Sequence, residues 1–259
     1  MLSQLTTAAT PLKYFEAAKT EIDGKPIVVT RTGFTGDLGY ELWIKTCDAT
    51  AIWDALMESG KGFNITPIGT TALKMARVEA GLLLMDVDFH SARHAWVDAQ
   101  RETPVELGWR WMFRNLKNDK RDFIGREAIE NELNTKSNRW TTVGLAIDWH
   151  DYERVHVEAG IPAPKFELYR ESTMSIYRRN EKLWDYAGYA TSFLFSSLLK
   201  KPIAIAKLPP DLAKPGTEVD LEIPVIRKPV NVLARVVSMP FFNPKRKTNC
   251  PIQESPESA

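Results

Sequence analysis

A glycine-rich motif near the beginning of the chain constrains its fold more than any other feature. The motif runs from Arg31 to Glu41 and has glycine at every third position from 33 to 39. Apolar runs at 27–29 and 42–44 flank it, and their β-branched and aromatic residues favour strands. Glycine supplies the positive φ angles of a tight connection, and the central Thr-Gly-Asp is typical of turns. The motif therefore predicts two strands joined by a compact loop.

The second of these strands is expected to begin with Tyr40 and Glu41, which places the Glu41 carboxylate beside the aromatic residues Phe34 and Tyr40. A carboxylate can accept two hydrogen bonds from the N–H and NH₂ edge of a flat nitrogen heterocycle, while aromatic rings border the plane of that ring. The alternative, which this stretch alone favours, is an ordinary hairpin with a surface glutamate.

The composition of the chain excludes several classes of protein. Its 259 residues allow one large or two modest domains, and its net charge of +1 gives no general attraction to nucleic acid or to an anionic membrane. Cys47 and Cys250 lie far apart without metal-ligand spacing, and no signal-like segment opens the sequence, so a reducing, cytoplasmic compartment is expected. No apolar run approaches the ~20 residues that span a bilayer.

The remaining sequence predicts an α+β protein. Helices are expected at 49–59, with Asp48 as N-cap, and from Pro67 toward Gly81. After a polar stretch at 131–138, short strands separated by turns indicate a small β-barrel or sandwich with almost no helix. The expected strands are 141–147, 186–192, 203–207, 218–223 and 232–238, with 149–180 as a polar insertion.

Two patterns suggest other kinds of site. Two aspartates and two histidines between Asp86 and His94 could hold a metal, but the glutamate of a hydrolytic zinc helix is missing, so a polar rim or capping loop is favoured. From Trp109 to Arg126, basic residues alternate with aromatic ones, a pattern that could bind RNA. A solvated helix and loop flank is favoured instead, because the overall charge is close to zero.

Several short motifs occur in a fixed order along the chain. In the first half they are RTGFTG through GYE at 31–41, RVEAGL at 77–82, the TPVE segment at 103–111 and DFIGR at 122–126. In the second half they are TVGL at 142–145, GYATS at 188–192, IAIA at 203–206, GTEV at 216–219 and MPF at 239–241. The ordered set covers about residues 12–242 and resembles the aminomethyltransferase family, the T-protein of the glycine cleavage system and its folate-dependent relatives.

The resemblance implies a fold and domain boundaries. It implies the C-terminal part of the family's folate-binding domain at 1–134, a C-terminal β-barrel domain at 139–245 and a mobile tail at 246–259. The opening residues line up with the middle of the family's folate-binding domain. The chain therefore looks N-terminally truncated relative to the family, as a fragment or as a shortened paralogue.

The resemblance also implies a tetrahydrofolate site. The family's glutamate at the end of the glycine-rich motif holds the pterin ring, and it corresponds to Glu41. Phe34 replaces the tyrosine usual beside the pterin and keeps its ring without the hydroxyl. Trp111, which follows the Pro-x-Glu motif, matches a tryptophan that lies against the folate, and Tyr40 is expected to be a further cofactor-binding residue.

Two departures from the family pattern bear on activity. Arg77 is retained as a supporting ion-pair residue, expected to pair with Glu79 or Asp86. Leu73, however, stands where the glycine-cleavage enzymes have a folate-binding arginine. The folate demethylases and the sarcosine- or dimethylglycine-processing branches of the superfamily also tend to lack that arginine. The family's catalytic aspartate lies in an upstream glycine-glycine-x-x-aspartate stretch that this sequence does not contain. No catalytic residue is therefore assigned, and the activity of the chain on its own is in question.

The leading hypothesis is a tetrahydrofolate-dependent aminomethyltransferase or methyltransferase. Its partner would be a small one-carbon donor or a lipoyl carrier protein, and neither a metal, a membrane nor a nucleic acid is expected. The first alternative is a folate-dependent demethylase acting on a small methylated donor, which Leu73 favours. The second alternative is a non-catalytic folate-binding module in RNA modification or iron–sulfur assembly, which the absent aspartate and the basic-aromatic stretch support.

Overall fold

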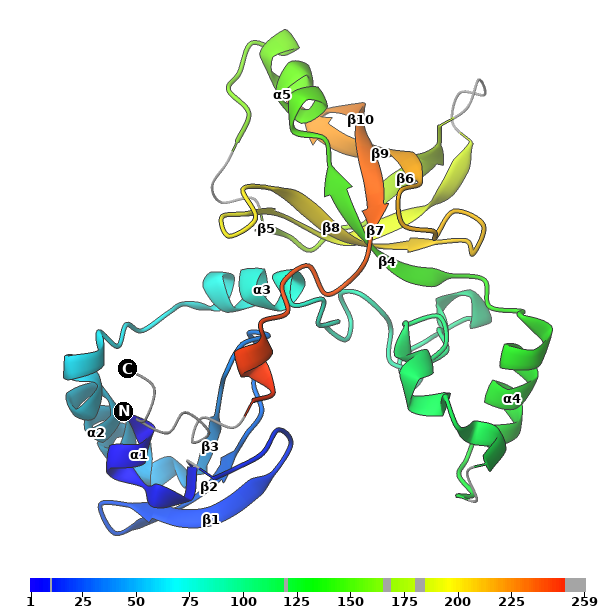
Figure 1. Ribbon diagram of the computed structural model, residues 1–259. Helices are drawn as coiled ribbons and strands as arrows, with labels where there is room; N and C mark the ends of the chain where they lie inside the picture. Colours follow the sequence, from blue (N-terminus) through cyan, green and yellow to red (C-terminus); the bar gives the residue numbers. More distant parts are fainter. Residues whose placement is uncertain (10, 119–120, 165–168, 180–184, 250–259) are drawn as a thin grey trace, which may run out of the picture. The chain divides into compact units, whose positions relative to one another are not determined.

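The structure is a computed structural model that describes residues 1–9, 11–118, 121–164, 169–179 and 185–249 (Figure 1). The chain forms two compact units. The first unit contains residues 1–80 and the segment from Phe242 onward, and the second contains Gly81–Phe241. The expected domain boundary at 134–139 lies inside the second unit, so that boundary stays a prediction.

The first unit is built on a three-stranded antiparallel sheet in the order β1-β2-β3. Its strands are β1 (Ala17–Ile22), β2 (Lys25–Thr30) and β3 (Glu41–Ile44), of which β1 was not predicted. One face is apolar, because Ile22, Ile27 and Val29 point toward the helices of this unit and are buried there. The other face is open to solvent.

Helices α1 (Leu2–Leu5) and α2 (Ala49–Gly60) cover the apolar face of this sheet. The unit also contains α3 (Thr70–Glu79) and the short 3₁₀ turns η1 (Thr7–Ala9), η2 (Thr46–Asp48), η3 (Lys61–Phe63) and η7 (Lys245–Lys247). The predicted helix at 49–59 is confirmed, and Ile52 buries its side chain against Ile22 and Ile27. The predicted helix from Pro67 begins later, at Thr70.

The second unit contains the predicted barrel, closed by six antiparallel strands (Figure 1). The strands are β4 (Thr141–Ile147), β6 (Met174–Arg178), β7 (Tyr186–Ser196), β8 (Lys201–Leu208), β9 (Glu218–Val225) and β10 (Lys228–Val237). The order is β7-β6-β9-β10-β4-β8, and β8 pairs back to β7. A short β5 (Tyr169–Arg170) adds to β7. Because the pairing of β8 with β7 closes the sheet, this domain is a barrel and not the sandwich, whose sheets would each keep two unpaired edge strands.

The expectation of almost no helix in this half was wrong. Helix α5 (Trp149–Glu158) lies over one end of the barrel (Figure 1). Asp148 caps it by accepting a 2.9 Å hydrogen bond from the backbone N–H of Asp151. Tyr152 and Val155 bury their side chains in the barrel core. These apolar residues recur every third position within a polar stretch, so the polar composition concealed a short amphipathic helix.

A largely irregular segment precedes the barrel in the second unit. It contains η4 (Asp98–Gln100), η5 (Trp109–Phe113), η6 (Leu116–Asn118) and α4 (Arg126–Thr135). Throughout the described residues, no helix has the length and apolar character needed to cross a membrane.

Candidate functional site

The carboxylate of Glu41 lies on the open face of the β1-β2-β3 sheet. Antiparallel pairing places Glu41 opposite Thr30, and side chains alternate along the strand, so Leu42 faces the helices while Glu41 faces solvent. Its Oε2 atom accepts hydrogen bonds from the hydroxyls of Thr32 and Thr30. The two hydroxyls fix the direction of the carboxylate and leave it accessible to a ligand from this face.

The two aromatic neighbours of Glu41 differ in their surroundings. Tyr40 is half-buried and packs against the cluster of Ala9, Leu12 and Val29 on the helix side of the sheet. Together with Leu38, Gly39 and Leu42 it lines an apolar cavity of about 460 Å³ on that side. Phe34 is half-buried within the glycine-rich loop. The structure therefore places Tyr40 on the opposite side of the sheet from the Glu41 carboxylate.

The glycine-rich loop is shaped by close backbone packing. Gly36 has a φ of +73°, and a Cβ atom there would lie 2.2 Å from the Cβ atom of Ala80, just after α3. Only glycine fits this position. Arg77 and Leu73 lie on α3 itself, where Arg77 is fully buried and Leu73 is half-buried.

The C-terminal segment is hydrogen-bonded to this loop within the first unit. The buried guanidinium of Arg31 donates to the backbone carbonyls of Arg246 (3.3 Å), Lys247 (3.0 Å) and Asn249 (3.2 Å). The same guanidinium lies 5.3 Å from the centre of the Tyr40 ring. Of the tail expected to be mobile, residues 246–249 therefore have defined partners, and residues 250–259 lie outside the described residues.

Trp111 belongs to the second unit, whereas Glu41, Phe34, Tyr40 and Arg77 belong to the first. It lies in η5 with 57% of its surface exposed. Its indole lines a pocket of about 610 Å³ formed by residues of η5, η6 and the loop that follows. The assembly of all five predicted residues around one ligand therefore remains a proposal.

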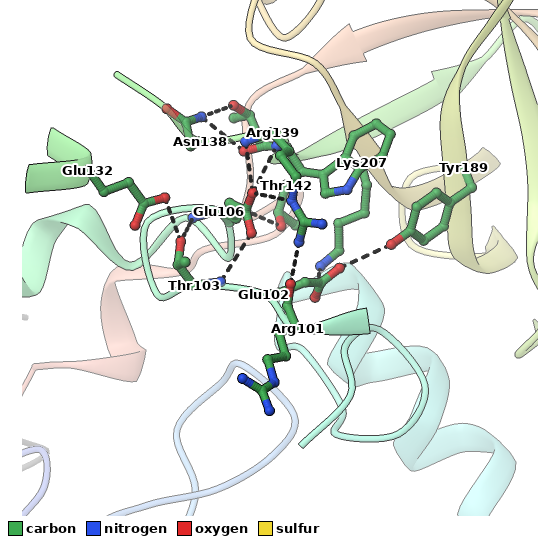
Figure 2. Close-up of polar contacts among 12 residues, drawn as sticks. Arg101, Glu102, Thr103, Glu106, Glu132, Asn138, Arg139, Thr142, Tyr189 and Lys207 are labelled. Atoms are coloured by element: carbon green, nitrogen blue, oxygen red, sulfur yellow. Dashed lines mark hydrogen bonds and ion pairs between the residues drawn. The ribbon is translucent and has the colours of Figure 1, made fainter. Parts of the chain in front are cut away.

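Sequence reasoning missed a buried polar network in the second unit (Figure 2). The ammonium of Lys207 forms a 2.5 Å ion pair with Glu102, and their side chains are 0% and 5% exposed. The hydroxyl of Tyr189 donates to the other carboxylate oxygen of Glu102 at 3.0 Å. Burial lowers the pKa of Lys207 against the opposing effect of Glu102, and burial raises the pKa of the Tyr189 phenol. The signal in the sequence was a lysine at the end of the apolar run 202–206.

Glu106 attaches the irregular segment to the beginning of the barrel (Figure 2). Its carboxylate accepts hydrogen bonds from the backbone N–H groups of Thr103 (3.1 Å) and Arg139 (2.8 Å). Its backbone carbonyl accepts from both the N–H and the hydroxyl of Thr142, and the Thr103 hydroxyl donates to Glu132. The Thr-Pro-Val-Glu motif therefore fixes the position of the segment that carries Trp111.

The aspartates of the suggested metal motif occupy different environments. Asp88 is 1% exposed and accepts hydrogen bonds from the hydroxyls of Thr191 (2.5 Å) and Ser192 (2.7 Å) and from the N–H of Leu84 (2.8 Å). Asp86 is exposed, 3.8 Å from the imidazole of His94. The described part of the chain contains no group of three or more His, Cys, Asp or Glu side chains that could hold a metal. Asp88 instead attaches its loop to β7.

Comparison with known proteins gives two matching family models. The GCVT N-terminal domain matches residues 1–114, and the glycine cleavage T-protein C-terminal barrel domain matches residues 165–243. Together the two models cover the sheet unit, the segment that carries Trp111 and most of the barrel.

Individual relatives agree with these models. The gamma subunit of a heme-dependent oxidative N-demethylase from Ectopseudomonas mendocina is 30% identical over 91% of this chain and 54% of its own length. The aminomethyltransferase of Chlorobaculum tepidum is 30% identical over 90% of this chain and 53% of its own. The solved glycine cleavage system aminomethyltransferase T from Bartonella henselae has the same fold, with a TM-score of 0.67 and 21% identity over 93% of this chain and 57% of its own. The chain spans about half the length of the curated relatives it matches, and it belongs to the aminomethyltransferase family of the glycine cleavage T-protein.

Proposed function

We propose that this chain binds tetrahydrofolate through Glu41 and takes part in aminomethyl or methyl transfer in the cytoplasm. The observation that supports this most directly is the Glu41 carboxylate, which stands at the end of the family's glycine-rich motif, on an open sheet face, held by Thr32. An accessible carboxylate with a fixed direction suits the N–H and NH₂ edge of a pterin.

The other predicted residues support the cofactor in different ways. Phe34 and Trp111 are proposed as aromatic walls that exclude water from the transferring carbon. Tyr40 lies on the other side of the sheet. It is proposed to stabilise the conformation of the glycine-rich loop through the contact between its ring and the Arg31 guanidinium. The buried Arg77 supports α3, against which Gly36 packs. Bound tetrahydrofolate would carry the one-carbon unit, and the protein would contribute orientation, which can lower the barrier of a two-reactant step substantially.

The donor is proposed to be a small methylated molecule or a lipoyl carrier protein. Leu73 is uncharged at the position where the glycine-cleavage enzymes have a folate-binding arginine. One relative is named a subunit of an oxidative N-demethylase. These two observations favour a folate-dependent demethylase as the second candidate. A non-catalytic folate-binding module stays the third, because no catalytic carboxylate is assigned in this chain.

Calorimetric titration of the chain with tetrahydrofolate tests the proposal. Glu41→Gln keeps the size of the side chain but removes its charge, and hydrogen bonds to a charged acceptor are worth about 1.5–3 kcal/mol. We therefore expect the affinity to fall at least ~10-fold. Glu21→Gln, an exposed glutamate on β1 of the same sheet, is the matched control and should bind as the parent does. Equal affinity of the Glu41→Gln and parent chains would reject the proposed anchor.

A further inference from the structure

A pocket of about 310 Å³ in the second unit has no ligand assigned to it by the proposed function. Residues between Val87 and Glu102 line it together with residues of β7, and its size is at the lower end of the range for small-molecule sites. The side chains that bear on recognition are three aromatic rings, a carboxylate and an imidazole: Phe89, Tyr186, Tyr189, Glu102 and His90. Among the described residues that line this pocket, none is a lysine or an arginine.

The three aromatic rings of the pocket have fixed orientations. Each of them packs edge-on against another aromatic ring that does not itself line the pocket. The pairs are Phe89 with Trp109, Tyr189 with Trp140, and Tyr186 with Tyr177, at 5.8, 5.6 and 6.4 Å between ring centroids and with interplanar angles of 83°, 80° and 78°. A ligand that contacts these rings therefore pays little to order them.

Glu102 gives the pocket a negative group. Its two carboxylate oxygens accept hydrogen bonds from the Lys207 ammonium at 2.5 Å and from the Tyr189 hydroxyl at 3.0 Å (Figure 2). Because Glu102 lines the pocket and Lys207 does not, this ion pair presents its negative end to the pocket. Asp88, also in the lining, accepts hydrogen bonds from hydroxyls of β7 and so attaches the loop that carries Phe89 to the barrel.

This set of groups selects for a small organic cation. The faces of aromatic rings carry negative charge density and attract ammonium groups, most strongly where water is excluded. An anion would meet the Glu102 carboxylate with no lysine or arginine in the described lining to compensate it. A bare metal ion needs several ligands, and the described residues hold no group of three or more His, Cys, Asp or Glu side chains suited to one.

We propose that this pocket binds a small methylated ammonium ion, with its methyl groups against Phe89, Tyr186 and Tyr189 and its charge facing Glu102. Methyl groups spread the positive charge of an ammonium over an apolar surface, which suits aromatic walls better than a strongly hydrated ion does. The inference goes beyond the proposed function, because none of the five residues proposed for the folate lines this pocket.

The test is a calorimetric titration of the full chain with tetramethylammonium chloride. It is run at about pH 8, where an ordinary imidazole is neutral, and at constant total chloride with sodium as the balancing cation. tert-Butyl alcohol is a neutral probe of similar shape, and potassium chloride supplies a cation without methyl groups. We expect tetramethylammonium to bind and each of the other two probes to bind at least about tenfold more weakly.

Variants of one lining ring assign the binding to this pocket. Tyr186→Leu keeps an apolar side chain but removes the ring, and it should weaken tetramethylammonium binding about fivefold. Tyr186→Phe keeps the ring and should bind within about twofold of the parent. Trp96→Leu removes a 92% exposed ring from the same irregular segment, outside the pocket lining, and should bind as the parent does.

Three results would overturn the inference. The first is the absence of saturable binding of tetramethylammonium to the parent chain. The second is equally tight binding of tert-butyl alcohol or of potassium, since apolar burial or charge alone would then explain the affinity. The third is unchanged affinity in folded Tyr186→Leu. If circular dichroism shows that Tyr186→Leu does not fold, Phe89→Leu replaces it with the same expectation, and unchanged affinity there also overturns the assignment.

Discussion

The guanidinium of Arg246 donates two hydrogen bonds to the carboxylate of Asp37, one from Nε at 2.6 Å and one from an Nη atom at 2.5 Å, each to a different oxygen. Residue 246 follows the whole barrel in sequence, whereas Asp37 lies in the middle of the glycine-rich loop. The pair therefore connects the end of the described chain to the loop that carries Phe34 and leads to Glu41. In the same unit, the Arg31 guanidinium donates to the backbone carbonyls of Arg246 and Lys247.

The first prediction concerns this pair and pH. The hydrogen bonds from Arg246 hold the pKa of Asp37 below its usual value of about 3.9. A carboxylate with a depressed folded-state pKa stabilises the fold above its unfolded pKa, and this stability is lost as pH falls through the folded value. Because Arg246 is 65% exposed, Asp37→Asn should cost only about 0.5–1 kcal/mol at pH 7. The difference, measured by urea unfolding, should shrink as the pH falls below the unfolded pKa of about 3.9 and be lost once the pH has passed the lower folded-state pKa. An equally large difference in the free energy of unfolding between the parent and Asp37→Asn chains at acid pH would contradict a stabilising role of the ionised Asp37.

The second prediction concerns the buried pair of Lys207 and Glu102. Removing one partner of a buried ion pair leaves an uncompensated charge, which typically costs 3–5 kcal/mol, so Lys207→Met should lower the free energy of unfolding by about that amount. Glu102→Gln/Lys207→Met removes both charges and should be clearly more stable than Lys207→Met alone. Lys201→Met, at the exposed end of the same strand, is the control. Denaturant titration measures all three, and a double variant no more stable than Lys207→Met would argue against a charged pair.

The sequence predicted the barrel and the glycine-rich loop for different physical reasons. Strands such as 141–147 were found because their apolar residues and flanking turns are local signals. The loop at 31–41 was found because positions such as Gly36, which touches Ala80, tolerate only glycine. Family resemblance then added the proposed cofactor-binding role of Glu41, whereas local rules alone favoured an ordinary surface residue.

Several features that escaped prediction depend on long-range contacts, and others do not. The partner of Lys207 is Glu102, more than a hundred positions earlier in the chain, so no local pattern joins them. Tyr40 was expected beside Glu41, but strand alternation sends neighbouring side chains to opposite faces. That rule could have been applied to the sequence, whereas the pairing of Asp37 with Arg246 could not.

The third prediction concerns Tyr189, whose phenol has a pKa raised above the usual value of about 10, mainly by burial. A raised folded-state pKa gives stability that is fully present below the unfolded value and is lost as pH rises toward the folded one. Tyr189→Phe removes one donor from Glu102 and should cost about 1 kcal/mol at neutral pH. The parent should then lose stability faster than Tyr189→Phe once the pH exceeds about 10. Parallel stability curves for the two chains would show that this phenol does not titrate differently on folding.

The last prediction concerns helix α5, which the polar composition of its stretch concealed. The Asp148 side chain accepts the N–H of Asp151, one of the donors that a helix leaves unpaired in its first turn. Asp148→Ala removes this cap and should lower the free energy of unfolding by about 1 kcal/mol. His150→Ala changes an exposed residue of the same first turn and should cost much less. Because α5 buries Tyr152 and Val155 in the barrel core, loss of the helix should destabilise the whole barrel. The Asp148→Ala chain should therefore unfold in one transition at lower denaturant, whereas a separate early transition of α5 would show that the helix is not part of the barrel's cooperative unit.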